Sequence, residues 1–167
     1  MKKILSLTLA LTMIGTALAG CGSKDAVTQT PAENTQQTAL VQQEQSQTEK
    51  ALALINTFAT GDTDTARSLL ADSYIQHNLA YGTGADAFIG SVEYLASADV
   101  KTTVNNIRAF EDGDKVFLQT IYNFAGAGEQ VAFDIFRFDE DGKIAEHWDV
   151  METIADQSTW QNQNGKF

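Results

Sequence analysis

The sequence predicts an α+β domain in which three helices precede an antiparallel sheet. Two observations support this class. Apolar residues recur every three or four positions over residues 48–98, and apolar and polar residues alternate over residues 100–151. Because the helices come before the strands and do not alternate with them, we expect the helices to cover one face of a strongly curved sheet.

Three segments carry the helical pattern. The first helix is expected in "TEKALALINTFATGD", where Gly61 supplies the stop. The second follows at once, with Asp62 or Thr63 as its N-cap and "DTARSLLADSYI" as its body, before the chain reaches "YIQHN". After a break at Gly82–Gly84, "ADAFIGSVEYLAS" makes the third.

Four segments carry the strand pattern. They are "VKTTVNNIRAF", "KVFLQTIYNFA", "EQVAFDIFRF" and "KIAEHWDVM", and they are separated by "EDGD", "GAG" and "DEDG". Each separator supplies Gly or Asp, which tolerate the positive φ angles of tight hairpin connections. The strands are therefore expected to form an antiparallel meander.

The first 20 residues have the three parts of a secretory signal peptide. Lys2 and Lys3 precede an apolar run from Ile4 to Leu18, and small residues follow before Cys21. Cys21 is the only cysteine in the chain, so no internal disulfide is expected. Residues 21–47 are dominated by Gln, Thr, Ser, Ala and Glu and are predicted to be a disordered tether, which leaves residues 48–167 as the domain.

The sequence "LAGC" resembles the lipobox at which bacterial prolipoproteins are lipidated on the thiol and cut before it. The resemblance implies that a lipid on Cys21 anchors the protein to the extracytoplasmic side of a membrane in the bacterial cell envelope. The alternative is ordinary secretory cleavage, because Ala17-Leu18-Ala19 also has small residues at suitable spacing.

The charge balance excludes some partners. The formal net charge is −11, and loss of Lys2 and Lys3 with the leader changes it to −13. A chain this acidic repels phosphate groups. We therefore expect neither nucleic-acid binding nor electrostatic adhesion to anionic lipid.

Four fragments resemble the SnoaL-like group of the nuclear transport factor two superfamily, in particular its aldol-condensation-type branch. They are "YIQHN", "DIFRF", "GKIAEHWDV" and the terminal "NGKF", and they occur in the family's order over residues 48–167. The resemblance implies a cone formed by a bent sheet around helices, with a central pocket and neither a metal nor an organic cofactor. The branch usually reads "QHNP" and "NGMF", where this chain has Leu79 and Lys166, and the missing proline is expected to loosen the turn that presents His77.

Relatives in this superfamily differ in what they do. Polyketide cyclases, ketosteroid isomerase and scytalone dehydratase move protons on small apolar substrates with carboxylates, histidines and tyrosines. Many other relatives have no known reaction, and ligand binding alone is the alternative for them. Family membership alone therefore implies a fold and a pocket, and it does not imply an enzyme.

The stretch "FRFDEDGKIAEHWDV" is expected to form the hairpin that carries the site. A three-residue turn closed by Gly142 sets these facing pairs: Phe138 with Ile144, Phe136 with Glu146, and Asp134 with Trp148. This register puts Arg137, His147 and Asp149 on the opposite face, near solvent. A slip of one residue would instead set Asp134 beside His147.

Asp134 and His77 are the candidate catalytic residues. Among apolar neighbours, desolvation favours proton uptake by Asp134, as a general base requires, and His77 would orient it or shuttle the proton. The alternatives are a structural carboxylate held by Arg137 or a backbone amide, and a histidine that caps the second helix. The residues expected to bind substrate are Tyr81, Phe88, Tyr122, Phe136, Glu146 and Trp148.

No metal site is predicted. His147 with Asp149 imitates half of one, but no carboxylate cluster lies near both histidines in the sequence. The sequence thus predicts a membrane-anchored domain that binds a small apolar or carbonyl-bearing molecule, with acid-base chemistry of the cyclase, isomerase or dehydratase kind. The alternative is a non-catalytic module that binds a ligand or forms a homodimer through the exposed sheet face.

Overall fold

The structure is a computed structural model that describes residues 45–167. The predicted signal peptide, the lipidation site at Cys21 and the predicted tether up to residue 44 lie outside the described residues.

Three α-helices come first in the described chain. α1 spans Gln47–Thr60, α2 spans Thr63–Leu69 and α3 spans Ala85–Ser97. A capping box starts α1, because Ser46 Oγ accepts from the Glu49 N–H while the Glu49 carboxylate accepts from the Ser46 N–H. Gly61 ends it with a φ of 73°, a left-handed conformation that favours glycine.

The predicted second helix is too long. α2 ends at Leu69, and Leu70–Gln76 form the strand β1, which pairs in parallel with β5. Tyr74 and Ile75 favour strand structure, and the open edge of β5 supplies hydrogen-bond partners that a sequence pattern cannot reveal. The sheet is therefore mixed, and the prediction of a wholly antiparallel sheet is wrong at this one edge.

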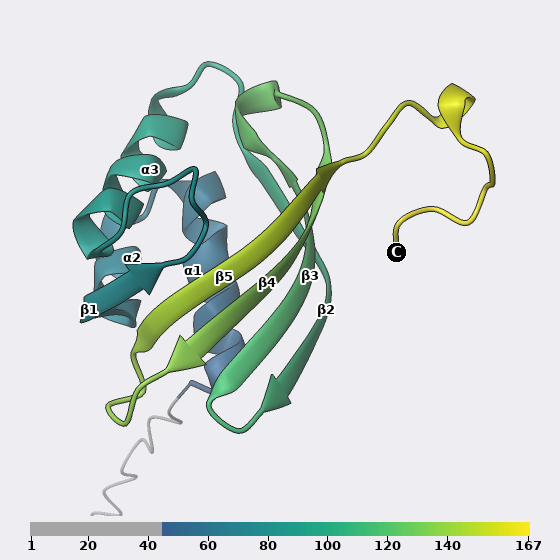
Figure 1. The fold of residues 1–167 in the computed structure, drawn as a ribbon. Helices are drawn as coiled ribbons and strands as arrows, with labels where there is room; N and C mark the ends of the chain where they lie inside the picture. Colours follow the sequence, from purple (N-terminus) through teal and green to yellow (C-terminus); the bar gives the residue numbers. More distant parts are fainter. Residues whose placement is uncertain (1–44) are drawn as a thin grey trace, which may run out of the picture. The chain divides into compact units, whose positions relative to one another are not determined.

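The other four strands form the predicted meander. β2 spans Thr103–Asp112, β3 Lys115–Asn123, β4 Gln130–Phe138 and β5 Ile144–Thr153, and the sheet order is β1-β5-β4-β3-β2. Figure 1 shows the three helices on one side of the curved sheet, so the predicted α+β arrangement is confirmed. None of the helices in residues 45–167 is both long enough and apolar enough to span a membrane.

The core lies between the helices and the inner face of the sheet. Leu54 of α1 and Val92 of α3 are buried there against Val116, Phe136 and Ile144 of the sheet. A pocket remains where α3 and the loop after β1 face the polar part of this inner surface.

The β4–β5 hairpin has the predicted turn but a different register. Gly142 has a φ of 68°, the Asp139 N–H donates to Lys143 O, and Phe138 pairs with Ile144 as expected. Ala145 is then an extra residue on β5, a β-bulge. Beyond the bulge the strands are offset by one residue, so the predicted pairing is wrong from that point onwards.

The bulge decides which side chains face the core. Phe136 lies opposite His147, and Asp134 lies opposite Asp149. Residues directly opposite one another share a face of the sheet. His147 and Asp149 therefore lie on the inner face with Asp134, whereas the predicted register puts them outside.

Candidate functional site

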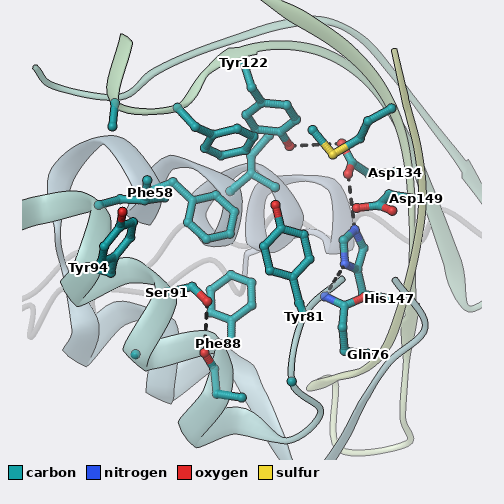
Figure 2. A pocket seen from close by; sticks show the side chains of 18 of the residues that line it. Phe58, Gln76, Tyr81, Phe88, Ser91, Tyr94, Tyr122, Asp134, His147 and Asp149 are labelled. Atoms are coloured by element: carbon teal, nitrogen blue, oxygen red, sulfur yellow. Dashed lines mark hydrogen bonds and ion pairs between the residues drawn. The ribbon is translucent and has the colours of Figure 1, made fainter. Parts of the chain in front are cut away.

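A cavity of about 730 Å³ lies between α3, the loop after β1 and the inner face of the sheet, a volume typical of small-molecule sites. In Figure 2, Phe58 and Phe88 stand on one side and the polar residues Asp134, His147 and Asp149 on the other. The cavity thus has mostly apolar walls and one polar side.

Asp134 lies at the centre of the polar side. It is 3% exposed. The Tyr122 hydroxyl donates to Oδ2 at 2.9 Å, and His147 Nε2 lies 3.2 Å from Oδ1. Burial raises the pKa of Tyr122 well above its ordinary value and the nearby Asp134 charge adds to this, so the phenol keeps the proton that it donates.

The tautomer of His147 follows from Gln76, the last residue of β1, and from Asn78 in the loop that follows. The Asn78 backbone N–H, which can only donate, lies 2.9 Å from Gln76 Oε1 and so fixes the orientation of the Gln76 amide. Gln76 Nε2 then donates to His147 Nδ1 at 3.0 Å. Because Nδ1 accepts, the ring proton sits on Nε2 and points at Asp134, and His147 is neutral.

Asp149 is the second carboxylate of the polar side. Asn78 Nδ2 donates to its Oδ1 at 2.7 Å, and the Ala80 N–H donates to Asn78 Oδ1 at 2.9 Å, which fixes that amide as well. Within residues 45–167, Oδ2 of Asp149 has no hydrogen-bond partner. Asp149 therefore offers an uncommitted oxygen to the pocket, whereas both oxygens of Asp134 are engaged.

The polar groups are close enough to influence one another. One ligand-type atom from each of Asp134, His147 and Asp149 lies within 4.8 Å of the other two. At that separation two carboxylates repel each other by about 3–4 kcal/mol at an effective dielectric constant of about 20. The spacing would suit a metal ion, but the His147 nitrogen that faces the carboxylates carries the ring proton and is not free to coordinate one.

His77 lies away from this site. Its ring stacks on Trp148 with centroids 4.4 Å apart, and its Nε2 lies 3.0 Å from Glu146 Oε2. The predicted pairing of His77 with Asp134 is therefore wrong. Since alternate residues of an extended strand face opposite sides, "YIQHN" sends Gln76 and Asn78 inward and His77 outward.

The predicted substrate-binding residues divide between the two faces of the sheet. Four of them line the cavity: Tyr81, Phe88, Tyr122 and Phe136. Glu146 and Trp148 lie on the outer face with His77, because the bulge at Ala145 reverses the face of each later residue. The sequence reasoning missed Gln76 and Asn78, and it put His147 and Asp149 on the wrong face. If "YIQHN" is interpreted as a strand, the alternation of its side chains between two faces indicates that Gln76 and Asn78 point the same way.

The outer cluster gives a prediction about pH. Hydrogen bonds from His77, and secondly from Arg137, hold the pKa of Glu146 below its ordinary value. A carboxyl group whose pKa is lower when folded stabilises the fold above its unfolded pKa of about 4.3, and this contribution is lost as the pH falls through the folded pKa. Glu146→Gln should therefore lower the free energy of unfolding by about 1 kcal/mol at pH 7.

The measurement is urea denaturation of Glu146→Gln and the unaltered chain at about pH 7 and about pH 3. We expect the difference between the two chains to shrink at the lower pH. A difference of the same size at both values would show that the Glu146 charge does not stabilise the fold.

Solved structures share this fold. An NTF2-like protein of unknown function from Cytophaga hutchinsonii matches with a TM-score of 0.57 at 16% identity, over 66% of this chain and 94% of that one. An LEH-like epoxide hydrolase from M. tuberculosis matches with a TM-score of 0.54 at 18% identity, over 62% and 80%. IdmH, a candidate polyketide cyclase from Streptomyces antibioticus, matches with a TM-score of 0.52 at 18% identity, over 65% and 93%. At these identities the likeness shows the fold alone.

Sequence comparison gives the family. No curated protein is a significant match to the chain. The model of the SnoaL-like domain matches residues 51–147, which is more than half of the chain and runs from α1 to His147 on β5. With the fold and the sequence in agreement, the chain belongs to the SnoaL-like domain family.

Proposed function

We propose that the cavity binds a small apolar or carbonyl-bearing molecule and that its carboxylate pair removes a proton from that molecule. One observation carries the proposal: Asp149, whose Oδ2 is uncommitted, lies beside the buried, doubly hydrogen-bonded Asp134 in a mostly apolar cavity. A carboxylate oxygen that is free of protein hydrogen bonds can act as a general base towards a bound ligand.

The two carboxylates have different roles in this proposal. Asp149 accepts the proton, because its free oxygen is the one that a ligand reaches. Asp134, the general base predicted from the sequence, holds the Nε2–H of His147 and the hydroxyl of Tyr122 in place.

Tyr81 supplies the complementary hydrogen-bond donor. Its side chain is half-exposed, and Figure 2 shows it between the aromatic wall and the polar side of the cavity. Nothing in residues 45–167 hydrogen-bonds to its hydroxyl group. That group is therefore available to donate to an oxygen on which negative charge develops when a neighbouring carbon loses a proton.

The test uses a chemical substrate that needs only a base and an oxygen-directed donor. In 5-nitrobenzisoxazole, removal of the C3 proton forms a nitrile, breaks the N–O bond and leaves the negative charge on a coloured phenolate. We expect the full chain to catalyse this elimination with saturable kinetics. Tyr81→Phe should lower kcat by about tenfold, because one donor to the developing charge is lost.

The reference for this experiment is acetate, a carboxylate in water. A rate that rises linearly with substrate and does not exceed that of equimolar acetate would contradict the acid-base proposal. That result would favour the alternative, a non-catalytic ligand-binding module.

We also propose that the domain is held on the extracytoplasmic side of a bacterial membrane by a lipid on Cys21. The support is the sequence "LAGC", which ends the predicted signal peptide and contains the only cysteine of the chain. A diacylglyceryl group would supply the two acyl chains that stable anchoring requires.

Cys21→Ser should therefore move the protein out of the membrane fraction or stop its processing. The measurement is membrane fractionation of bacteria that express either form, with mass spectrometry of the mature N terminus. An unmodified cysteine in the membrane-bound wild-type protein would contradict the lipid anchor.

A homodimer is the second candidate function. The outer face of the sheet exposes Phe117, Phe133 and Val150 on the three adjacent strands β3, β4 and β5, and Phe133 lies directly opposite Val150. Exposed aromatic and aliphatic side chains in one region favour association. Light scattering of the wild-type chain and of Phe133→Asp would detect a dimer that depends on this face.

A further inference from the structure

The charge balance of the cavity restricts the ligand that it suits. Asp134 and Asp149 bring two carboxylates, and none of the described residues that line the cavity is Lys or Arg. His147 does not balance this charge, since the Gln76 amide occupies Nδ1 as a donor and a backbone N–H fixes that amide. The polar side of the cavity is thus negative and has no cation of its own.

The opposite wall is aromatic. The rings of Phe58 and Phe88 lie 4.9 Å apart, and Tyr122 stacks on Phe124 at the same centroid distance. Tyr81 adds a further ring that faces the polar side. Aromatic faces carry negative electrostatic potential and attract cations. This wall and the carboxylate pair therefore both favour a positively charged ligand.

We infer that the ligand of this cavity is a protonated amine on an apolar body, with its ammonium group against Asp134 and Asp149. The inference rests on the proposed ligand-binding function and specifies its chemical class. An ammonium N–H donates to the free Oδ2 of Asp149, and the positive charge relieves the repulsion between the two carboxylates. The apolar body lies among the rings of Phe58, Phe88 and Tyr81.

This ligand class is compatible with proton removal. The carboxylate pair carries two negative charges, and acceptance of one proton by Asp149 leaves the charge of Asp134 to hold the ammonium group. A positive charge next to the reacting carbon also makes that carbon more acidic.

Three compounds with one skeleton and three charges test the inference. 4-Phenylbutylamine is cationic, 4-phenylbutan-1-ol is neutral and 4-phenylbutanoate is anionic at neutral pH. The measurement is the Kd of each for the full chain by calorimetry, at low salt and at about 0.5 M NaCl. We expect the amine to bind at least about tenfold more tightly than the alcohol, and the anion to bind most weakly.

The salt series and two variants separate the cavity from the acidic surface. Attraction by the overall negative charge is screened at high salt, whereas the preference for the amine should persist if its charge meets the carboxylates inside the cavity. Asp149→Asn should lower the ratio of alcohol Kd to amine Kd, because one of the two carboxylates that meet the ammonium group is lost. Asp112→Asn, which removes an exposed carboxylate at the end of β2, should leave that ratio unchanged.

The outcomes distinguish this inference from the proposed function. Equal affinity for amine and alcohol, or tightest binding of the anion, would overturn the inference while the cavity remained a ligand site. Failure of all three compounds to bind at millimolar concentration would overturn both.

Discussion

Asp149→Asn is expected to slow the elimination of 5-nitrobenzisoxazole by about 10²–10⁴-fold, which raises the activation barrier by about 3–5 kcal/mol. Asparagine has the size of aspartate, and its oxygen can still accept from Asn78, so the cavity keeps its shape. It lacks the basic oxygen that takes the proton. The measurement is kcat from the release of the coloured phenolate.

His77→Ala is the matched control for that substitution. His77 belongs to the same sequence motif as Gln76 and Asn78, but it lies against Trp148 and Glu146 on the outer face. We expect its kcat to stay within about twofold of the wild-type value, since the side chain touches neither carboxylate. A large loss in His77→Ala with little loss in Asp149→Asn would reverse the assignment and restore the prediction made from the sequence.

Phe136→Ala is expected to lower the free energy of unfolding by about 3–5 kcal/mol. Phe136 is 1% exposed, and its ring stacks on His147 with centroids 4.5 Å apart. Its loss removes buried apolar surface and leaves a cavity beside the site. For a domain of this size the expected fall in Tm is on the order of 10–20 °C, measurable by thermal unfolding followed by circular dichroism.

Phe133→Ala provides the comparison on the same strand. Phe133 is 55% exposed on the outer face, three residues before Phe136. The same change of side chain should therefore lower the free energy of unfolding by only about 0.5 kcal/mol. Similar losses in the two variants would contradict the assignment of β4 faces on which the whole site depends.

The parts of the fold that depend on local pattern could be predicted from the sequence. α1 and α3 have long apolar stripes with a glycine beside an end, and the meander has a turn segment between each pair of strands. These signals lie within a few residues of the elements that they specify. Gly142 also takes the left-handed conformation that its place in "DEDG" indicates.

β1 could not be predicted in the same way. Its seven residues follow α2 directly, and "DTARSLLADSYI" continues a helical pattern into them. What makes them a strand is the edge of β5, about 70 residues later in the chain. This non-local pairing decides that Gln76 and Asn78, and not His77, point inward to His147 and Asp149.

The site depends on one further residue that local pattern does not determine. Ala145 and Ile144 are both buried, although neighbouring residues of a regular strand face opposite sides. This pair of adjacent apolar residues is the only sequence signal of the bulge, and a register without a bulge explains the alternation equally well. Because of the bulge, His147 and Asp149 line the cavity in place of Glu146 and Trp148.

The most direct test of the central claim is an NMR titration of the isotope-labelled full chain with 5-nitroindazole, which is neutral at pH 7. This compound has the shape of the elimination substrate but no N–O bond to break. If the inner cavity is the ligand site, shift changes should concentrate at Tyr122, Asp134, His147 and Asp149, and saturation should need more ligand in Asp149→Asn. Changes confined to outer-face residues such as Phe117, Phe133 and Val150 would contradict the claim.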